Sequence, residues 1–322
     1  MHAQSRDQGL LSAIRRVIII CLFSAIGIVH FAAAYSPFID GAIADVKIKV
    51  VDDRGEAVPD AAISVTFYTA PEKVDIKRGK TDALGYFFAS GRCIGEAHLW
   101  IRKDGYYETK IEPVFRTLSD TEVERLRKWS NGTVETTATL KKKRNPVTTS
   151  FHAVDYLYPI PATNEIVRLD LETFKWCPPY GNGKHDDLHI LYEVWQDQDN
   201  WLAFHKKLTI TAPNCVDGFY RRKVDATSNF RYEYKAVTNE VYDKTIVYNV
   251  DRRSGKIDVV ELPLDDEFFT FRMRTVTNEV GEVVQAYYGR IAERSGHMFG
   301  LRMKTWFNTK PNDTNLEDAR VR

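Results

Sequence analysis

The densest group of side chains that could do chemistry lies between Gly181 and His189, in the segment GNGKHDDLH. It contains two imidazoles, His185 and His189, and two carboxylates, Asp186 and Asp187, which are side-chain types that bind metal ions or transfer protons near neutral pH. The two histidines are four residues apart, but they follow a glycine-containing loop, and the HExxH pattern of zinc enzymes is missing. The segment is therefore a candidate polar cluster, with a surface loop as the simpler alternative.

Aromatic residues near the same segment form a second candidate site. Trp176, Tyr180, Trp195 and Trp201 lie close to predicted turns, and aromatic rings on a β-sheet can stack on the flat faces of sugars. Packing within the protein is the alternative, because a β-sandwich of this size buries several large rings. The four residues are a candidate aromatic ligand platform.

Other catalytic patterns are missing from the sequence. It contains neither a GxSxG nucleophile elbow nor a glycine-rich loop that could hold phosphate. A pair of carboxylates acting on a glycosidic bond leaves no local signature, so a hydrolase with its site in the second half of the chain stays open as an alternative. The sequence predicts no cofactor and no metal, and we favour a non-catalytic protein over an enzyme.

The cysteines allow little cross-linking. Cys93, Cys177 and Cys215 follow residue 34, and an odd number of three permits at most one internal disulfide. Cys177 and Cys215 are the preferred pair because both lie in the second half of the chain. Three reduced, buried thiols are the alternative, since a secreted domain of this size does not need a disulfide.

The N-terminus has the order of a signal peptide. A polar stretch with three arginines precedes the apolar residues 17–34, and Ala32 and Ala34 supply small side chains where a signal peptidase would cut before Tyr35. The alternative is an uncleaved membrane anchor formed by residues 17–34, which is near the shortest length that spans a bilayer. Either way, we expect a secreted, periplasmic or cell-surface protein.

The charge of the chain limits its partners. The first 34 residues hold three of the 45 basic and one of the 44 acidic residues, so 42 and 43 remain in the rest. A near-neutral chain argues against nucleic acid and acidic membrane surfaces as partners. A polysaccharide or another envelope protein fits better, with membrane contact only through the N-terminal segment if it is uncleaved. The length after residue 34 predicts two domains.

The first domain is predicted over residues 44–143. Polar and apolar residues alternate over 46–50, 63–67 and 98–102, which indicates strands with one buried face. Asp- and Gly-containing turns separate them, as in Asp52-Asp53-Arg54-Gly55 and Thr81-Asp82-Ala83-Leu84-Gly85. Short strands at this spacing predict a small antiparallel β-sandwich.

The same domain carries a family resemblance. The residues that match are Asp52 and Gly55, Val58-Pro59 and Ala61, Thr81-Asp82, Gly85 and Phe87, and Gly105-Tyr106. With these residues the segment 44–143 resembles the carboxypeptidase regulatory-like domain, a prealbumin-like β-sandwich, although Asp60 stands where that family usually has glycine. The resemblance implies a structural or binding module of an exported protein and no catalytic residues.

One helix and a linker complete this half. Ser119 to Glu122 reads as a capping box, and Val123, Leu126 and Trp129 follow at helical spacing, which predicts a short surface helix that ends near Asn131-Gly132. The basic run over 141–144 and the following Pro146 predict a solvated linker.

The second domain, residues 147–322, matches no family that the sequence suggests, but it is strand-rich. Two stretches alternate aromatic or apolar with charged or polar residues, over 230–235 and 269–274, and predict a sheet with one face in solvent. The sequence VTNEV occurs at both 237–241 and 276–280, which predicts two similar hairpins. The predicted fold is all-β: an Ig-like or prealbumin-like sandwich followed by a second antiparallel β-rich domain, with an N-terminal signal helix.

Overall fold

The computed structural model describes residues 35–69, 73–154, 158–197, 200, 203–225, 227–253, 256–261, 267–292, 301 and 303–320. Nearly all regular structure in these residues is β-strand, arranged in four sheets with two short helices, so the all-β prediction is confirmed. The predicted signal segment, residues 1–34, lies outside the described residues. Among the helices that are described, none has the length and apolar character needed to span a membrane.

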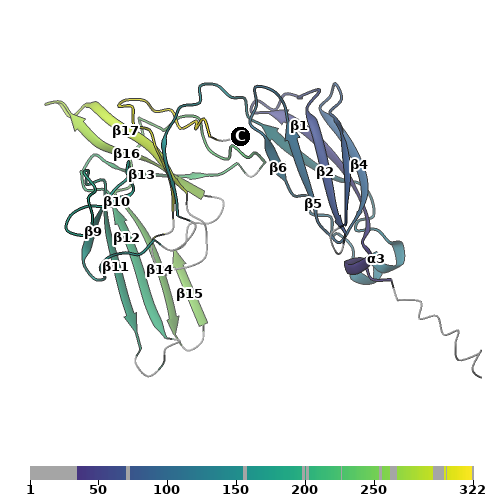
Figure 1. Cartoon of the computed structure of the whole chain (residues 1–322), viewed down its shortest axis with the longest axis horizontal. Helices are drawn as coiled ribbons and strands as arrows, with labels where there is room; N and C mark the ends of the chain where they lie inside the picture. Colours follow the sequence, from purple (N-terminus) through teal and green to yellow (C-terminus); the bar gives the residue numbers. More distant parts are fainter. Residues whose placement is uncertain are drawn as a thin grey trace, which may run out of the picture.

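The first region, residues 42–140, consists of two sheets around one apolar core (Figure 1). The three-stranded sheet has the order β4–β1–β7 and the four-stranded sheet the order β3–β2–β5–β6. Their bounds are β1 Ala42–Asp52, β2 Ala62–Thr69, β3 Lys73–Lys80, β4 Tyr86–Cys93, β5 Ala97–Arg102, β6 Thr109–Ile111 and β7 Val134–Leu140. The short helix α2, Pro37–Asp40, precedes β1.

One strand pair departs from the predicted antiparallel arrangement. β7 pairs with β1 in parallel. The reason is the path of the chain after β6, which returns to the start of β1, where Ile43 bridges with Lys128, before β7 begins. The other strand pairs of this region are antiparallel.

The alternating pattern places the core of the first region as predicted. Val46, Ile48 and Val50 of β1 are fully buried, and the lysines between them lie toward solvent. Apolar residues of β2 and β5, such as Phe67 and Leu99, close the core from the opposite sheet. Period-two alternation therefore determines which face of each strand is buried.

Two turns of this region share one mechanism. The carboxylate of Asp52 accepts hydrogen bonds from the N–H groups two and four residues later, and Asp82 does the same in its own turn. Gly85 follows with φ of 80°, and an added Cβ there would lie 2.5 Å from the carbonyl oxygen of Val50. Both the backbone angle and the close approach require glycine at this position.

The predicted helix is present but shorter. α3 spans Asp120–Leu126, and Glu122 accepts hydrogen bonds from the N–H and hydroxyl of Ser119, as in a capping box. Arg127 then adopts a left-handed conformation with φ of 52°, which ends the helix five residues before Gly132. Trp129 is fully buried, and its indole N–H donates to the carbonyl of Cys93, so this residue belongs to the core rather than to the helix.

The second region, residues 147–320, also consists of two sheets around a core. The six-stranded sheet has the order β10–β9–β11–β12–β14–β15, and the five-stranded sheet has the order β13–β16–β17–β18–β8 (Figure 1). Their bounds are β8 Ser150–Ala153, β9 Ile166–Asp170, β10 Lys175–Trp176, β11 Leu188–Gln196, β12 Phe204–Thr211, β13 Gly218–Lys223, β14 Thr245–Arg253, β15 Lys256–Glu261, β16 Glu267–Thr277, β17 Val283–Ala292 and β18 Lys304–Phe307.

Two expectations for the second region are wrong. Residues 230–235 form irregular structure rather than a strand. They cover the face of the five-stranded sheet that was predicted to face solvent, because their aromatic rings pack on it, as Tyr232 does on Trp306 with 5.5 Å between ring centroids. The two VTNEV copies also differ. The second forms the β16–β17 turn, where Gly281 has φ of 84°, but the first lies outside any strand.

The C-terminal segment lies between the two regions (Figure 1). The buried carboxylate of Glu317 accepts hydrogen bonds from the hydroxyl of Tyr107 at 2.8 Å and from the backbone N–H groups of Arg144 and Asn145 at 2.8 and 2.7 Å. The Tyr107 ring stacks on Phe230 with centroids 4.6 Å apart. One carboxylate thus connects the first region, the linker and the end of the chain.

Candidate functional site

The main polar site of the second region is built around Arg274. β16 shifts its register against β17 just after Met273, and Arg274 itself has φ of 53°. Its guanidinium lies over the rings of Phe307 and Tyr287, at 4.7 and 5.4 Å. The side chain is only 17% exposed. It extends from the five-stranded sheet toward carboxylates on the side of the six-stranded sheet.

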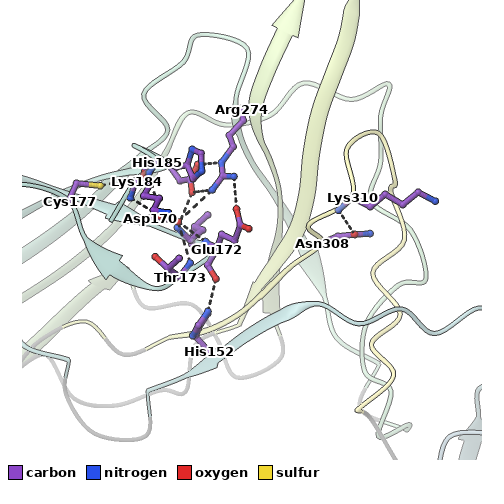
Figure 2. Close-up of polar contacts among 12 residues, drawn as sticks. His152, Asp170, Glu172, Thr173, Cys177, Lys184, His185, Arg274, Asn308 and Lys310 are labelled. Atoms are coloured by element: carbon purple, nitrogen blue, oxygen red, sulfur yellow. Dashed lines mark hydrogen bonds and ion pairs between the residues drawn. The ribbon is translucent and has the colours of Figure 1, made fainter. Parts of the chain in front are cut away.

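Three carboxylates surround this guanidinium (Figure 2). Asp187 accepts two hydrogen bonds of 2.8 Å from Nε and Nη2 of Arg274, in the bidentate geometry that is strongest for this pair. Glu172 accepts a third bond of 2.8 Å from Nη1. Asp170 Oδ1 lies 3.5 Å from Nη2. We call Asp170, Glu172, Asp187 and Arg274 the Arg274 network.

The pairing of two strands brings these carboxylates together. β9 and β11 are antiparallel neighbours in which Leu169 pairs with Leu188. Asp170 therefore ends β9 beside Asp187, the residue that directly precedes β11. Both are buried, at 0% and 2% exposure.

Backbone donors use the remaining oxygens. Asp170 accepts hydrogen bonds from the N–H groups of Glu172, Thr173, Lys184 and His185. Burial alone would raise the pKa of Asp170, but these N–H donors outweigh it and lower the pKa below its ordinary value. Burial alone would likewise lower the pKa of Arg274, and the bonds to Asp187 and Glu172 raise it instead. Both groups are therefore held in their charged forms.

A further carboxylate fixes the backbone of β16 at this point. Asp217 accepts hydrogen bonds from the N–H groups of Arg274 and Thr275, at 2.9 and 3.0 Å. Burial raises the pKa of Asp217, with these donors acting in the opposite direction. His152 lies at the other side of the network, with Nε2 2.9 Å from the carbonyl oxygen of Glu172 (Figure 2).

The predicted polar cluster does not converge on one site. Asp187 faces inward to Arg274, whereas Asp186 and His189 lie partly exposed and contact each other, with 3.1 Å between Oδ2 and Nε2. His185 is exposed and joins the network only through its backbone N–H. In the described part of the chain, no group of three or more His, Cys, Asp or Glu side chains is arranged to hold a metal ion.

The predicted aromatic platform is not formed by the residues described. Trp176 is buried on the core side and stacks on Tyr158 with centroids 5.3 Å apart. Trp195 is 55% exposed and lies seven residues along β11 from Leu188, about 23 Å from the end where β10 lies. Because the offset of seven residues is odd, Trp195 also lies on the opposite face of the strand from buried Leu188. Tyr180 is exposed and its hydroxyl contacts Glu165, and Trp201 lies outside the described residues.

The predicted Cys177–Cys215 disulfide is not present. Cys93, Cys177 and Cys215 are all free thiols. Cys177 is buried, and its Sγ donates to the carbonyl oxygen of His185, whereas Cys215 is exposed in the turn before β13. Burial raises the pKa of the Cys177 thiol, as do the nearby carboxylates, so this side chain stays protonated at neutral pH.

Sequence reasoning missed Arg274, Asp170 and Glu172. In the alternating pattern over 269–274, Arg274 falls on the face predicted to be solvated, and the backbone irregularity that turns it inward has no marker such as glycine or proline. Acidic residues at the facing ends of β9 and β11 were a usable signal, but only once the pairing of those strands is known.

Comparison with known proteins gives only distant similarities. No protein-family model matches the chain, and no curated protein sequence matches it. Among solved structures, 3-chlorocatechol 1,2-dioxygenase from Rhodococcus opacus 1CP aligns at 15% identity over 33% of this chain and 62% of that one, with a TM-score of 0.26. A streptococcal ancillary pilin aligns at 11% identity over 87% of this chain and 63% of its own, with a TM-score of 0.22.

A third solved structure, a protein from Bacteroides uniformis described as carbohydrate-binding, aligns at 9% identity over 81% of this chain and 95% of its own, with a TM-score of 0.21. The alignments span less than two thirds of the length of the dioxygenase and the pilin. At these identities and TM-scores, the similarities say nothing about activity or ligand.

Proposed function

We propose that the protein is exported and serves a structural or ligand-binding role at the cell envelope or outside the cell, without catalysis. The observation that carries the non-catalytic part is the saturation of the Arg274 network. Asp187 has both oxygens bonded to Arg274, and Asp170 accepts four backbone N–H donors.

A catalytic carboxylate needs an oxygen within hydrogen-bonding reach of a substrate. Asp170 and Asp187 are buried and bonded within the protein, so a substrate would have to displace Arg274 or the backbone donors. The arrangement is instead suited to joining the two sheets of the second region, because its positive member comes from one sheet and its negative members come from the other and from the turn that follows β9.

The rival function is a hydrolase with its site in the second region. The observation that favours it is the exposed pair of His189 and Asp186, in which a carboxylate orients an imidazole, with Arg168 3.7 Å from the same carboxylate. Such a pair could act as a general base. It lies at the start of β11, away from the Arg274 guanidinium that holds Asp187.

The first region fits the role of an accessory module, in keeping with its resemblance to the carboxypeptidase regulatory-like domain. Support comes from the matched turns, in which Asp52 and Asp82 make equivalent hydrogen bonds and Gly55 and Gly85 have positive φ. Such modules contribute binding surfaces or spacing rather than chemistry.

Two measurements test the proposal. Fractionation of cells that produce the tagged protein, with N-terminal sequencing, should recover it outside the cytoplasm, starting near Tyr35 or retaining residues 17–34 as an anchor. A panel of esterase, glycosidase and peptidase substrates should show no turnover above that of the His189→Ala variant. Cytoplasmic recovery would refute the export part. Turnover that is lost in His189→Ala, while the variant keeps its thermal unfolding midpoint, would establish the hydrolase instead.

A further inference from the structure

A cavity of about 540 Å³ lies in the first region, beside the linker. Its lining comes from the start of β2, the end of β5 and the turn that follows β5, together with Lys143 of the linker. Ala62 and Arg102, which line it, are cross-strand partners, so the cavity sits at the end of the four-stranded sheet. Its size is in the range that holds small ligands.

The charges that line the cavity are balanced. Three lining side chains are cationic, from Arg102, Lys103 and Lys143, and three are anionic, from Asp60, Asp104 and Glu108. A ligand with a net charge would be attracted by one set and repelled by the other. A neutral ligand that carries several hydroxyl groups can instead accept hydrogen bonds from the cations and donate to the carboxylates.

Several of these groups are held in place before any ligand arrives. Arg102 and Glu108 form an ion pair, with 3.2 Å between Nη2 and Oε1. The ammonium group of Lys103 donates to the carbonyl oxygen of Pro59. The backbone N–H of Lys143 donates to the carbonyl oxygen of Gly105 at 2.8 Å. The bonded side chains of Arg102, Glu108 and Lys103 lose less entropy on binding than free ones would, whereas the Lys143 bond fixes only its backbone.

Tyr106 supplies the one aromatic surface among the lining residues. Tyr106 is half-buried and packs partly against the apolar core of the first region, and its backbone is held by the bond from its N–H to the carbonyl oxygen of Lys103 and by the bridge to Lys142. A flat ring edged by charged hydrogen-bonding groups matches a pyranose ring, whose C–H face is apolar and whose edge carries hydroxyl groups.

We infer that this cavity binds a unit of a neutral saccharide, with its C–H face on Tyr106 and its hydroxyl groups bonded to the carboxylates and cations around it. The inference rests on the proposed ligand-binding function and gives that function a site and a ligand class. The site includes the linker residue Lys143, and the two residues that follow it are bonded to Glu317. A bound saccharide would therefore contact both the first region and the segment that leads to the second.

The test is calorimetric titration of the purified protein with neutral hexasaccharides of the malto, cello, xylo and chito series, and with oligogalacturonate and a chitosan hexamer as charged comparators. At least one neutral series should bind, and neither charged oligosaccharide should bind as tightly. Tyr106→Ala should weaken binding about tenfold or more, because the variant lacks the aromatic face on which the sugar stacks. A tenfold change corresponds to about 1.4 kcal/mol of binding free energy.

Asp104→Ala provides a second variant, because Asp104 is exposed in a turn and its loss should weaken binding without affecting folding. Trp195→Ala is the matched control, an exposed aromatic residue of the second region whose loss should leave binding unchanged. Thermal unfolding shows whether each variant is folded. If Tyr106→Ala does not fold, the binding measured for Asp104→Ala decides the test.

The inference is overturned if no neutral series binds, if the charged oligosaccharides bind better, or if Trp195→Ala abolishes binding while the cavity variants keep it. An exported protein that binds none of the neutral series would refute the saccharide site and leave the proposed location intact. A cytoplasmic protein that binds one of them through Tyr106 would support the saccharide site and refute the proposed location.

Discussion

Two arginines on the neighbouring strands β16 and β17 are buried, and the protein surrounds them with opposite kinds of groups. Arg274 is held by the carboxylates of Asp187 and Glu172. Arg290 is fully buried between aromatic rings, with its guanidinium 4.2 Å from the ring centroids of both Tyr232 and Trp306. Within the described residues, no carboxylate lies within ion-pair distance of Arg290.

The difference appears in the pKa of each group. Carboxylates raise the pKa of Arg274 against the effect of burial, whereas burial lowers the pKa of Arg290 to about 10. Nη1 of Arg290 donates to the carbonyl oxygen of Leu316, but its Nε and Nη2 have no hydrogen-bond partner among the described groups. Removal of one member of a buried ion pair is costly because the other charge stays buried without a partner, whereas Arg290 has no carboxylate partner to lose.

The largest expected effect tests the paired side of this comparison. Asp187→Ala should lower the free energy of unfolding by about 3–5 kcal/mol, because it leaves the Arg274 charge buried without its bidentate partner. Denaturant unfolding with constant m-value measures this difference. The matched control is Asp186→Ala, one residue earlier and partly exposed, which should change the stability by less than about 1 kcal/mol. Equal effects of the two variants would mean that the Arg274 network does not stabilise the fold.

The next effect concerns the segment that covers Arg290. Glu317→Gln keeps the shape of the side chain but weakens its hydrogen bonds to Tyr107 and to the N–H groups of Arg144 and Asn145. Bonds to a charged acceptor are worth about 1.5–3 kcal/mol, so a loss of this order is expected. Limited proteolysis should cut the linker faster in Glu317→Gln than in the wild type. Tyr107→Phe removes only one donor and should have a smaller effect on both measurements.

Unchanged proteolysis of the linker in Glu317→Gln would contradict the role of this carboxylate in joining the two regions. The Asp187→Ala variant is a useful second comparison. It should lower global stability without a selective increase in cleavage between residues 141 and 146, because the Arg274 network lies within the second region.

Two carboxylates near Arg274, those of Asp170 and Asp217, should contribute to the pH dependence of stability with opposite signs. The lowered pKa of Asp170 means that its ionised form stabilises the fold above the unfolded value of about 4, and this contribution is lost as the pH falls through the folded pKa. Burial raises the pKa of Asp217, so its contribution is present below about pH 4 and is lost as the pH rises through the folded pKa.

Asp170→Asn should therefore be more destabilising at pH 7 than at pH 3. Asp217→Asn should compare more favourably with the wild type at pH 7 than at pH 3. Unfolding curves of both variants and the wild type across this range give the two slopes, and slopes of the same sign would contradict the assignment.

The sequence predicted the first region better than the second for a physical reason. In β1, alternation decides burial because one face meets the core and the other meets solvent, as Val46 and Ile48 show. In β16 and β17 the second face is covered by residues 228–236 and by the C-terminal segment, which are distant in sequence. This cover encloses Arg290 without any local signal in the sequence. Alternation over 269–274 placed Arg274 in solvent, whereas the backbone irregularity after Met273 turns its side chain inward.

The candidate site could be predicted only in part for a related reason. His185, Asp186, Asp187 and His189 are close in sequence, but the first three lie in irregular backbone before β11, where spacing does not set the direction of a side chain, and only Asp187 reaches the interior. The partners of Asp187 come from a turn near residue 172 and from residue 274, and strand pairing rather than local sequence brings them together.

The smallest expected effect concerns Arg290, the arginine that lies among aromatic rings. Arg290→Met removes a buried charge that lacks a carboxylate and keeps a long side chain among the rings of Tyr232 and Trp306. The variant loses the cation–π attraction but no longer has the cost of burying an unpaired charge. These two contributions should nearly cancel, so the free energy of unfolding should change by no more than about 1 kcal/mol. Arg274→Met, its matched counterpart, should cost about 3–5 kcal/mol because it leaves Asp187 buried without a cation. If Arg290→Met is as destabilising as Arg274→Met, the rings around Arg290 stabilise a buried guanidinium as well as carboxylates do, and the contrast between the two arginines is refuted.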